Sequence, residues 1–116
     1  MDLKTRVLSD WTVVSVSGDV DIFTTYKLRE HLLAALDRPG RRILVDLSGV
    51  TFMDESGLGV LVFIRRTAML HGGTLRLLAP TQSMRWLLKA SGLSGTFAVS
   101  LDLLAARQAE PELVGS

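Results

Sequence analysis

Residues 43–61 read ILVDLSGVTFMDESGLGVL, and this stretch indicates the class of fold. Its first three residues form a short continuous apolar run, which is typical of a strand buried on both faces of a sheet. We assign residues 46–54 to a loop. The apolar spacing that begins at Ser56 predicts a helix that runs to about Leu70. A buried strand followed by a helix is the repeating unit of an α/β protein with a parallel sheet.

Two strands and a helix are predicted before this stretch. Residues 3–8 and 11–17 predict the strands, and the second is rich in β-branched residues that largely alternate with others. Ser9 and Asp10 between them form turns readily, so we expect an antiparallel hairpin. From Thr25 to Leu36, apolar residues recur three and four apart, which predicts an amphipathic helix.

After residue 70 the pattern continues to alternate between strands and helices. We expect strands at 74–79 and 97–99, and helices at 82–90 and 101–107. The predicted order is therefore β-β-α-β-α-β-α-β-α, a mixed, mostly parallel sheet of about five strands with about four helices. We expect one domain over residues 1–107, followed by a flexible tail at 108–116, because that segment holds a proline among small or polar residues.

The composition excludes several classes of function. The net charge of +1 gives the chain no polybasic character that would draw it to nucleic acid or anionic lipid. There is no cysteine, so disulfides, thiolate metal sites and a thiol nucleophile are excluded. With only two histidines, His31 and His71, we expect no metal site. No apolar run approaches the roughly 20 residues that span a bilayer, and we expect a cytoplasmic protein that does not contact membranes.

The candidate site is the junction at which the second helix begins. In open α/β sheets, sites gather at the carboxyl ends of the strands. Asp54 precedes the helix and Ser56 lies in its first turn, where unpaired N–H groups and a partial positive charge would receive a phosphate well. An alternative interpretation of the local pattern is that Asp54 and Ser56 only cap the helix.

Two enzymatic or nucleotide-binding motifs are incomplete at this junction. Gly57 and Gly59 suggest a dinucleotide fingerprint, but Val62 stands where its third glycine is due. A serine hydrolase would have a glycine two residues before Ser56, where this chain has Asp54. We therefore expect neither catalysis nor a cofactor, and a nucleotide-sensing role is the weakest of the functions considered.

Residues 54–59, Asp-Glu-Ser-Gly-Leu-Gly, resemble the Asp-Ser-Ser-Gly-Leu-Gly motif of STAS domains in bacterial anti-sigma factor antagonists. Gly-Asp-Val-Asp at 18–21 is similar to the family's Gly-Glu-Leu-Asp, and the segments 45–50 and 27–30 also match. The resemblance covers about residues 3–107, and the predicted order of elements agrees with the family's fold.

The resemblance implies a switch between protein partners. The unphosphorylated domain would bind an anti-sigma factor that is also a serine kinase, and would thereby release a sigma factor. Phosphorylation of Ser56 would break that complex, and a serine phosphatase would restore it. We expect a monomer or a weak homodimer. We expect the phosphate to act by adding roughly two negative charges to the contact surface.

The expected contact surface combines the motif with one face of the second helix. Leu58, Leu61, Val62 and Met69 share a face by helical spacing, whereas Val60, Phe63 and Ile64 point mostly elsewhere. That second group is either buried by neighbouring elements or meets the partner. The residues expected to contact the partner are Asp21, Asp54, Glu55, Ser56, Gly57, Leu58, Val60, Phe63 and Ile64.

Glu55 departs from the family pattern, which often has serine or threonine at that position. It places a permanent carboxylate beside Ser56. The alternative function is therefore a phosphorylation-independent STAS subunit of a transport complex or another regulatory complex.

Overall fold

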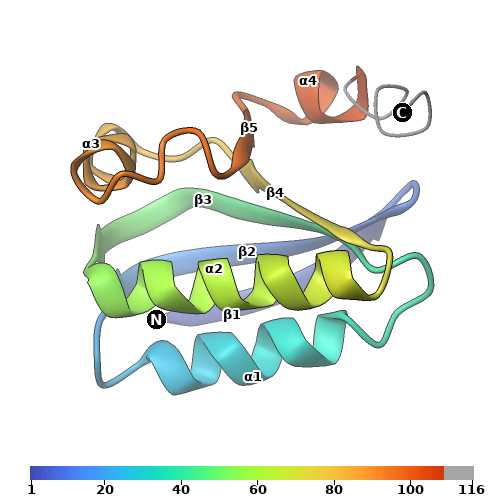
Figure 1. Ribbon diagram of the computed structural model, residues 1–116, viewed down its shortest axis with the longest axis horizontal. Helices are drawn as coiled ribbons and strands as arrows, with labels where there is room; N and C mark the ends of the chain where they lie inside the picture. Colours follow the sequence, from blue (N-terminus) through green and yellow to red (C-terminus); the bar gives the residue numbers. More distant parts are fainter. Residues whose placement is uncertain (109–116) are drawn as a thin grey trace.

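A mixed sheet runs through the computed structural model, which describes residues 1–108 (Figure 1). Its five strands lie in the order β1-β2-β3-β4-β5, so that each strand neighbours the next one along the chain. The strands are β1 (Asp2–Leu8), β2 (Trp11–Val20), β3 (Arg42–Met53), β4 (Thr74–Leu78) and β5 (Ala98–Ser100). Only the β1–β2 pair is antiparallel, and the other three pairs are parallel. The predicted fold class and element order are confirmed.

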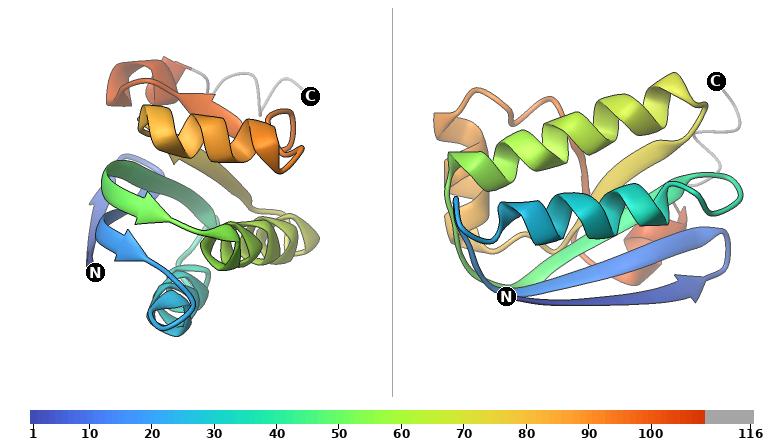
Figure 2. Two further views of the ribbon diagram at one scale, coloured as in Figure 1. Left: turned by 90° about the vertical axis from the view of Figure 1, so that its left-hand side faces the viewer. Right: turned by 90° about the horizontal axis from the view of Figure 1, so that it is seen from below.

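Helices lie on both sides of this sheet (Figure 2). They are α1 (Thr25–Ala35), α2 (Glu55–Leu70), α3 (Gln82–Ala90) and α4 (Leu103–Gln108). α1 and α2 lie side by side on one face, and α4 packs on the other face. α3 lies beside the carboxyl end of β3. Gln108, which we had assigned to the tail, is the last residue of α4, and the rest of the predicted tail lies outside the described residues.

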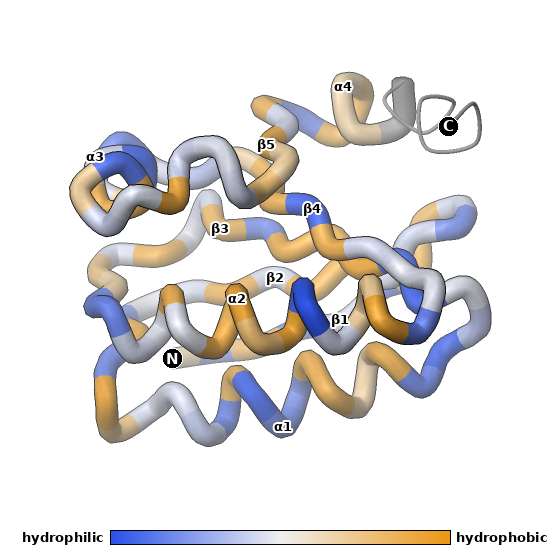
Figure 3. The backbone as a smooth tube through the Cα atoms, in the orientation of Figure 1, coloured by the Kyte–Doolittle hydropathy of each residue, from blue (hydrophilic) through white to orange (hydrophobic). Residues whose placement is uncertain are grey.

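Apolar residues recur along the central strands (Figure 3). Because successive side chains of a strand point to opposite faces, these residues contribute to a core on each side of the sheet. Val14, Ile43 and Val45 belong to the larger cluster, with Leu28 of α1 and Leu61 of α2. A smaller cluster on the opposite face holds Trp11, Val13, Leu44, Leu78 and Ala106. β2 and β3 are therefore buried on both faces, which explains the continuous apolar run at residues 43–45.

The prediction of a loop at residues 46–54 is wrong, because β3 continues to Met53. The second half of the strand pairs with β2, with Gly49 opposite Ser17 and Met53 opposite Val20. Two register shifts interrupt this pairing. A Cβ atom on Gly49 would lie 2.9 Å from the Ser17 Cβ, so the glycine permits the close approach of the two strands. Irregular pairing of this kind replaces the period-two pattern by which a strand is recognised.

Substitutions on α2 test which of its faces packs against the sheet. Leu61→Ala removes a side chain that is fully buried in the larger cluster, and should lower the free energy of unfolding by about 2–5 kcal/mol. Leu70→Ala is the matched control on the same helix, because Leu70 is 78% exposed, and it should change that free energy by no more than about 0.5 kcal/mol. Urea unfolding measures both, and equal losses would contradict this placement of α2.

Candidate functional site

The carboxyl ends of β2 and β3 bring the two candidate loops together. Val20 and Met53, the last residues of the two strands, are register partners. The Asp54 backbone N–H then donates to the Val20 carbonyl oxygen at 3.1 Å. The loop that enters α1 and the junction that enters α2 therefore start at the same edge of the sheet, as Figure 2 shows. This edge is where open α/β sheets carry their sites.

Asp54 is the N-cap of α2, so the capping interpretation is correct for this residue. Its carboxylate accepts the backbone N–H of Ser56 at 2.9 Å and that of Gly57 at 3.3 Å. It also accepts the hydroxyl hydrogen of Ser56. These bonds satisfy N–H groups that would otherwise be unpaired in the first turn.

The pKa of the Asp54 carboxyl is lowered from its ordinary value. The largest cause is the hydrogen bond from the Ser56 hydroxyl, and backbone N–H groups of Gly57, Ser56 and Ile22 add to it, while burial opposes the shift. Asp54 is therefore a carboxylate at neutral pH that holds the Ser56 hydroxyl in place.

Ser56 lies half-buried in the first turn of α2, with the exposed Glu55 before it. The next residue, Gly57, is buried, and a Cβ atom there would lie 2.7 Å from Met53 Cγ and 3.0 Å from Val20 Cγ1. The absence of a side chain at Gly57 lets the start of α2 approach the ends of both strands. Ser56 thus has a partly accessible hydroxyl, and the close packing of the neighbouring Gly57 against the strand ends fixes the position of that hydroxyl.

A groove between α1 and α2 opens from Ser56. It is a cavity of about 310 Å³, and the residues that line it are Thr25, Arg29, Ser56, Gly59, Val60 and Phe63. A Cβ atom on Gly59 would have no other atom within 4 Å, so the fold does not require this glycine. Phe63 is exposed and Val60 is half-buried. The groove therefore offers a hydroxyl, a cation and apolar surface to whatever enters it.

The loop between β2 and α1 adds exposed apolar side chains that our sequence analysis missed. Ile22 is 69% and Phe23 is 81% exposed, and Tyr26 in the first turn of α1 is half exposed. Asp21, a predicted contact residue, is half-buried and organises this loop, since its carboxylate accepts the Phe23 N–H at 2.9 Å and the Thr24 N–H at 3.2 Å. The sequence signal that could have predicted this exposed apolar surface is the presence of apolar residues in a predicted loop.

The orientation predicted for α2 is partly wrong. Its buried residues are Gly57, Leu58, Leu61, Ile64 and Ala68. Ile64 is completely buried, so it faces the core and not a partner, whereas Met69 is exposed. The three-and-four spacing of the buried residues carries the core-facing stripe through Ile64 and away from Val62 and Met69. The predicted contact residues that keep exposed or half-buried side chains are Asp21, Asp54, Glu55, Ser56, Val60 and Phe63. Gly57 and Leu58 are buried like Ile64.

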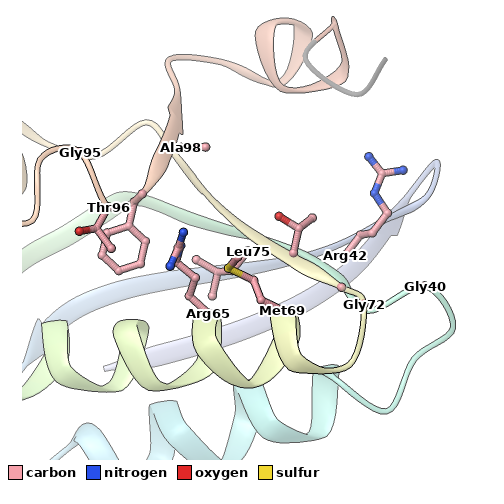
Figure 4. Close-up of a pocket in the computed structure, with 12 residues that line it drawn as sticks. Gly40, Arg42, Arg65, Met69, Gly72, Leu75, Gly95, Thr96 and Ala98 are labelled. Atoms are coloured by element: carbon pink, nitrogen blue, oxygen red, sulfur yellow. The ribbon is translucent and has the colours of Figure 1, made fainter. Parts of the chain in front are cut away.

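A larger cavity of about 680 Å³ lies towards the other end of α2, away from Ser56. Arg65 and Met69 of α2 line it together with Thr96 of the segment before β5, and Figure 4 shows the Arg65 side chain extending into this space. Among the described residues, no group of three or more metal-ligating side chains is placed to hold a metal ion. Within the same part of the chain, no helix is long and apolar enough to cross a membrane.

Comparison with known proteins identifies the family of this chain. The family model described as "Mlab, STAS domain" matches residues 5–105, from within β1 to within α4. The chain belongs to the STAS-domain family. The resemblance found in the sequence is thus confirmed.

Several relatives of this STAS domain carry regulatory names. The anti-sigma-B factor antagonist of Bacillus subtilis is 29% identical over 87 residues, which is 75% of this chain and 79% of the relative. That of Listeria monocytogenes is 27% identical over 108 residues, which is 93% of this chain and 89% of the relative.

Solved structures of the same fold agree with this assignment. An anti-sigma factor antagonist from Mycobacterium paratuberculosis is 28% identical, with a TM-score of 0.83 and coverage of 93% of this chain and 92% of that one. The anti-sigma factor antagonist SpoIIAA in its unphosphorylated form is 20% identical, with a TM-score of 0.77 and coverage of 95% and 97%. At this identity, the second likeness concerns the fold alone.

The cap at Asp54 predicts a pH-dependent contribution to stability. Asp54→Ala should lower the free energy of unfolding by about 1 kcal/mol at pH 7, whereas Asp54→Asn should retain most of it, because asparagine also caps. Since the pKa of Asp54 is lowered in the folded chain, its charged cap stabilises above the ordinary value of 3.8 and this stabilisation is lost as the pH falls through the folded pKa. The deficit of Asp54→Ala should therefore shrink in acid.

Urea unfolding at a series of pH values measures this deficit. A gap between the parent and Asp54→Ala that stays constant from pH 7 to pH 2.5 would show that the carboxylate does not stabilise α2 through its charge.

Proposed function

We propose that this STAS domain is an anti-sigma factor antagonist, that it binds an anti-sigma factor with serine kinase activity, and that Ser56 is its switch. The observation that carries the proposal is the Ser56 hydroxyl, held by Asp54 at the mouth of the α1–α2 groove. Ile22 and Phe23 add exposed apolar surface to the neighbouring loop. The names of the relatives support the choice of partner.

In the unphosphorylated state the groove and the β2–α1 loop form the contact surface. Exposed apolar side chains such as Phe23 and Phe63 supply the buried area of such a complex, and polar residues surround them. The complex occupies the anti-sigma factor and releases a sigma factor in the cytoplasm. The domain is a binding partner and a kinase substrate, and catalyses no step itself.

Phosphorylation reverses this state. The γ-phosphoryl group of ATP passes to Ser56 Oγ, the hydroxyl loses its proton, and ADP leaves. The product carries about two additional negative charges next to Asp54 and Glu55. A partner surface that packs here would have to desolvate those charges, which weakens the complex. Because the phosphate lies at the start of a helix, α2 itself tolerates it. A serine phosphatase restores the hydroxyl by hydrolysis, releasing inorganic phosphate.

Glu55 supports the alternative of an unregulated STAS subunit in a transport or other regulatory complex. Its exposed carboxylate stands beside Ser56 whether or not the serine is modified. A partner adapted to that permanent charge would discriminate less between the two states of Ser56. A sulfate transporter family protein from Wolinella succinogenes has the same fold, with a TM-score of 0.74 at 16% identity.

Phosphorylation of Ser56 can be tested by intact-mass analysis after incubation with ATP and the candidate kinase. The parent should gain one phosphoryl group and Ser56→Ala none. Ser48→Ala is the matched control, because the Ser48 hydroxyl donates to Asp46 at 2.7 Å, a local contact like that of Ser56 with Asp54, and it should be modified like the parent. Ser56→Ala should still bind the kinase, and Ser56→Asp should bind it less tightly.

A phosphoryl group on Ser56→Ala would refute the switch. A stable complex without any phosphate on the parent would favour the unregulated subunit, and neither phosphate nor complex would exclude that kinase as the partner.

A substitution at Gly59 can test whether the groove binds the partner without destabilising the fold. Gly59→Ala should raise the free energy of unfolding by about 0.5–1 kcal/mol, because the methyl group meets no other atom and alanine favours a helix. The same methyl group would obstruct a partner in the groove, at a cost of about 1–3 kcal/mol, or roughly 5-fold to 150-fold in affinity. Gly57→Ala should instead destabilise the fold, because its methyl group would overlap Met53.

Urea unfolding and calorimetric titration with the anti-sigma factor give the two values for Gly59→Ala. A variant that is more stable and binds as tightly as the parent would show that the partner does not enter the groove at this point.

A further inference from the structure

Within residues 1–108, Arg29 is a cation without a partner, and it lies on the wall of the groove that begins at Ser56. It projects from α1, one helical turn after Thr25, and both residues line the 310 Å³ cavity with Ser56. Arg29 is exposed and forms no ion pair, hydrogen bond or ring contact within the described residues. Nothing in residues 1–108 therefore uses its charge.

Carboxylates surround Ser56 and would repel a phosphate there, so a nearby cation would stabilise the phosphate. Asp54 and Glu55 belong to the start of α2, and Asp21 lies in the loop before α1. Lys27 and Arg29 are the cations in the first half of α1. Of these two, Arg29 lines the cavity and Lys27 does not. A phosphate on Ser56 would also lose the hydrogen bond that the hydroxyl donates to Asp54, and would lie close to that carboxylate.

We propose that Arg29 is the counterion of phosphorylated Ser56, with its guanidinium reaching across the groove from α1 to the phosphate on α2. This rests on the proposed function and explains how the phosphate acts. Guanidinium binds phosphate through two parallel N–H donors, and it is the side chain best suited to such a contact. An arginine in this position offsets part of the charge that the phosphate adds beside Glu55.

The same contact would close the groove. A guanidinium held by the phosphate lies over the open surface at Gly59, which the unmodified domain leaves free. Phosphorylation then excludes the partner by occupying the groove as well as by adding charge. The phosphorylated and unphosphorylated domains then differ in whether the groove is filled as well as in charge. The permanent carboxylate of Glu55 therefore does not make the two states alike.

The test uses the full chain with phosphoserine incorporated at position 56 during synthesis, so that no kinase is needed. The second ionisation of the phosphate, which has an ordinary pKa of about 6, is followed by ³¹P NMR against pH. Arg29→Gln should raise the pKa of the phosphate by about half a unit, as expected for an exposed ion pair. Lys27→Gln removes one cation from the same helix outside the groove, and should raise that pKa much less. Arg29→Lys should give an intermediate value.

Equal shifts in Arg29→Gln and Lys27→Gln would overturn the proposal, because they would mean that the phosphate feels only the general charge of α1. A phosphate whose pKa is the same in all of these variants would overturn it as well. Circular dichroism on each variant checks that α1 and α2 remain folded. Failure of the unphosphorylated chain to bind an anti-sigma factor would refute the proposed function, but it would leave this titration readable, since no partner takes part in it.

Discussion

The hydrogen bond from the Asp54 N–H to the Val20 carbonyl joins the ends of two strands and sets the start of two helices. Because Val20 and Met53 are also register partners, the loop into α1 and the first turn of α2 cannot move apart without breaking the end of the sheet. Gly57 strengthens this constraint, since its lack of a side chain brings α2 against both strands. Ser56 is consequently held by the sheet and not by a free loop.

The two glycines of the motif have different roles although only one residue separates them. Gly57 is required by packing, because any side chain there would meet Met53 and Val20. Gly59 is not required by packing and lowers helix propensity, which favours a functional reason for it. The inward side of the start of α2 thus serves the fold, and its outward side is left open at Gly59.

Much of this arrangement could be predicted from the sequence. Apolar runs and helical spacing gave the order of elements, and the position of Ser56 at the start of a helix followed from that order. The second half of β3 escaped prediction because its pairing with β2 is shifted twice, so that it lacks a regular alternation. The orientation of Ile64 escaped it because α2 carries apolar residues on several sides, and only the packed structure selects which of them are buried. The exposed Ile22 and Phe23 depend on a turn organised by Asp21, a contact that residue spacing does not reveal.

The pairing of an aspartate with a serine two residues later occurs twice in β3 and its continuation, at Asp46–Ser48 and at Asp54–Ser56. In both places the hydroxyl donates to the carboxylate, but only the second serine lies on a helix and beside a groove. An enzyme that read the local residues alone would find little to separate the two. Under the proposed function, an enzyme that modifies Ser56 and not Ser48 would have to recognise the folded surface, and a short peptide copied from residues 52–60 would lack most of that surface.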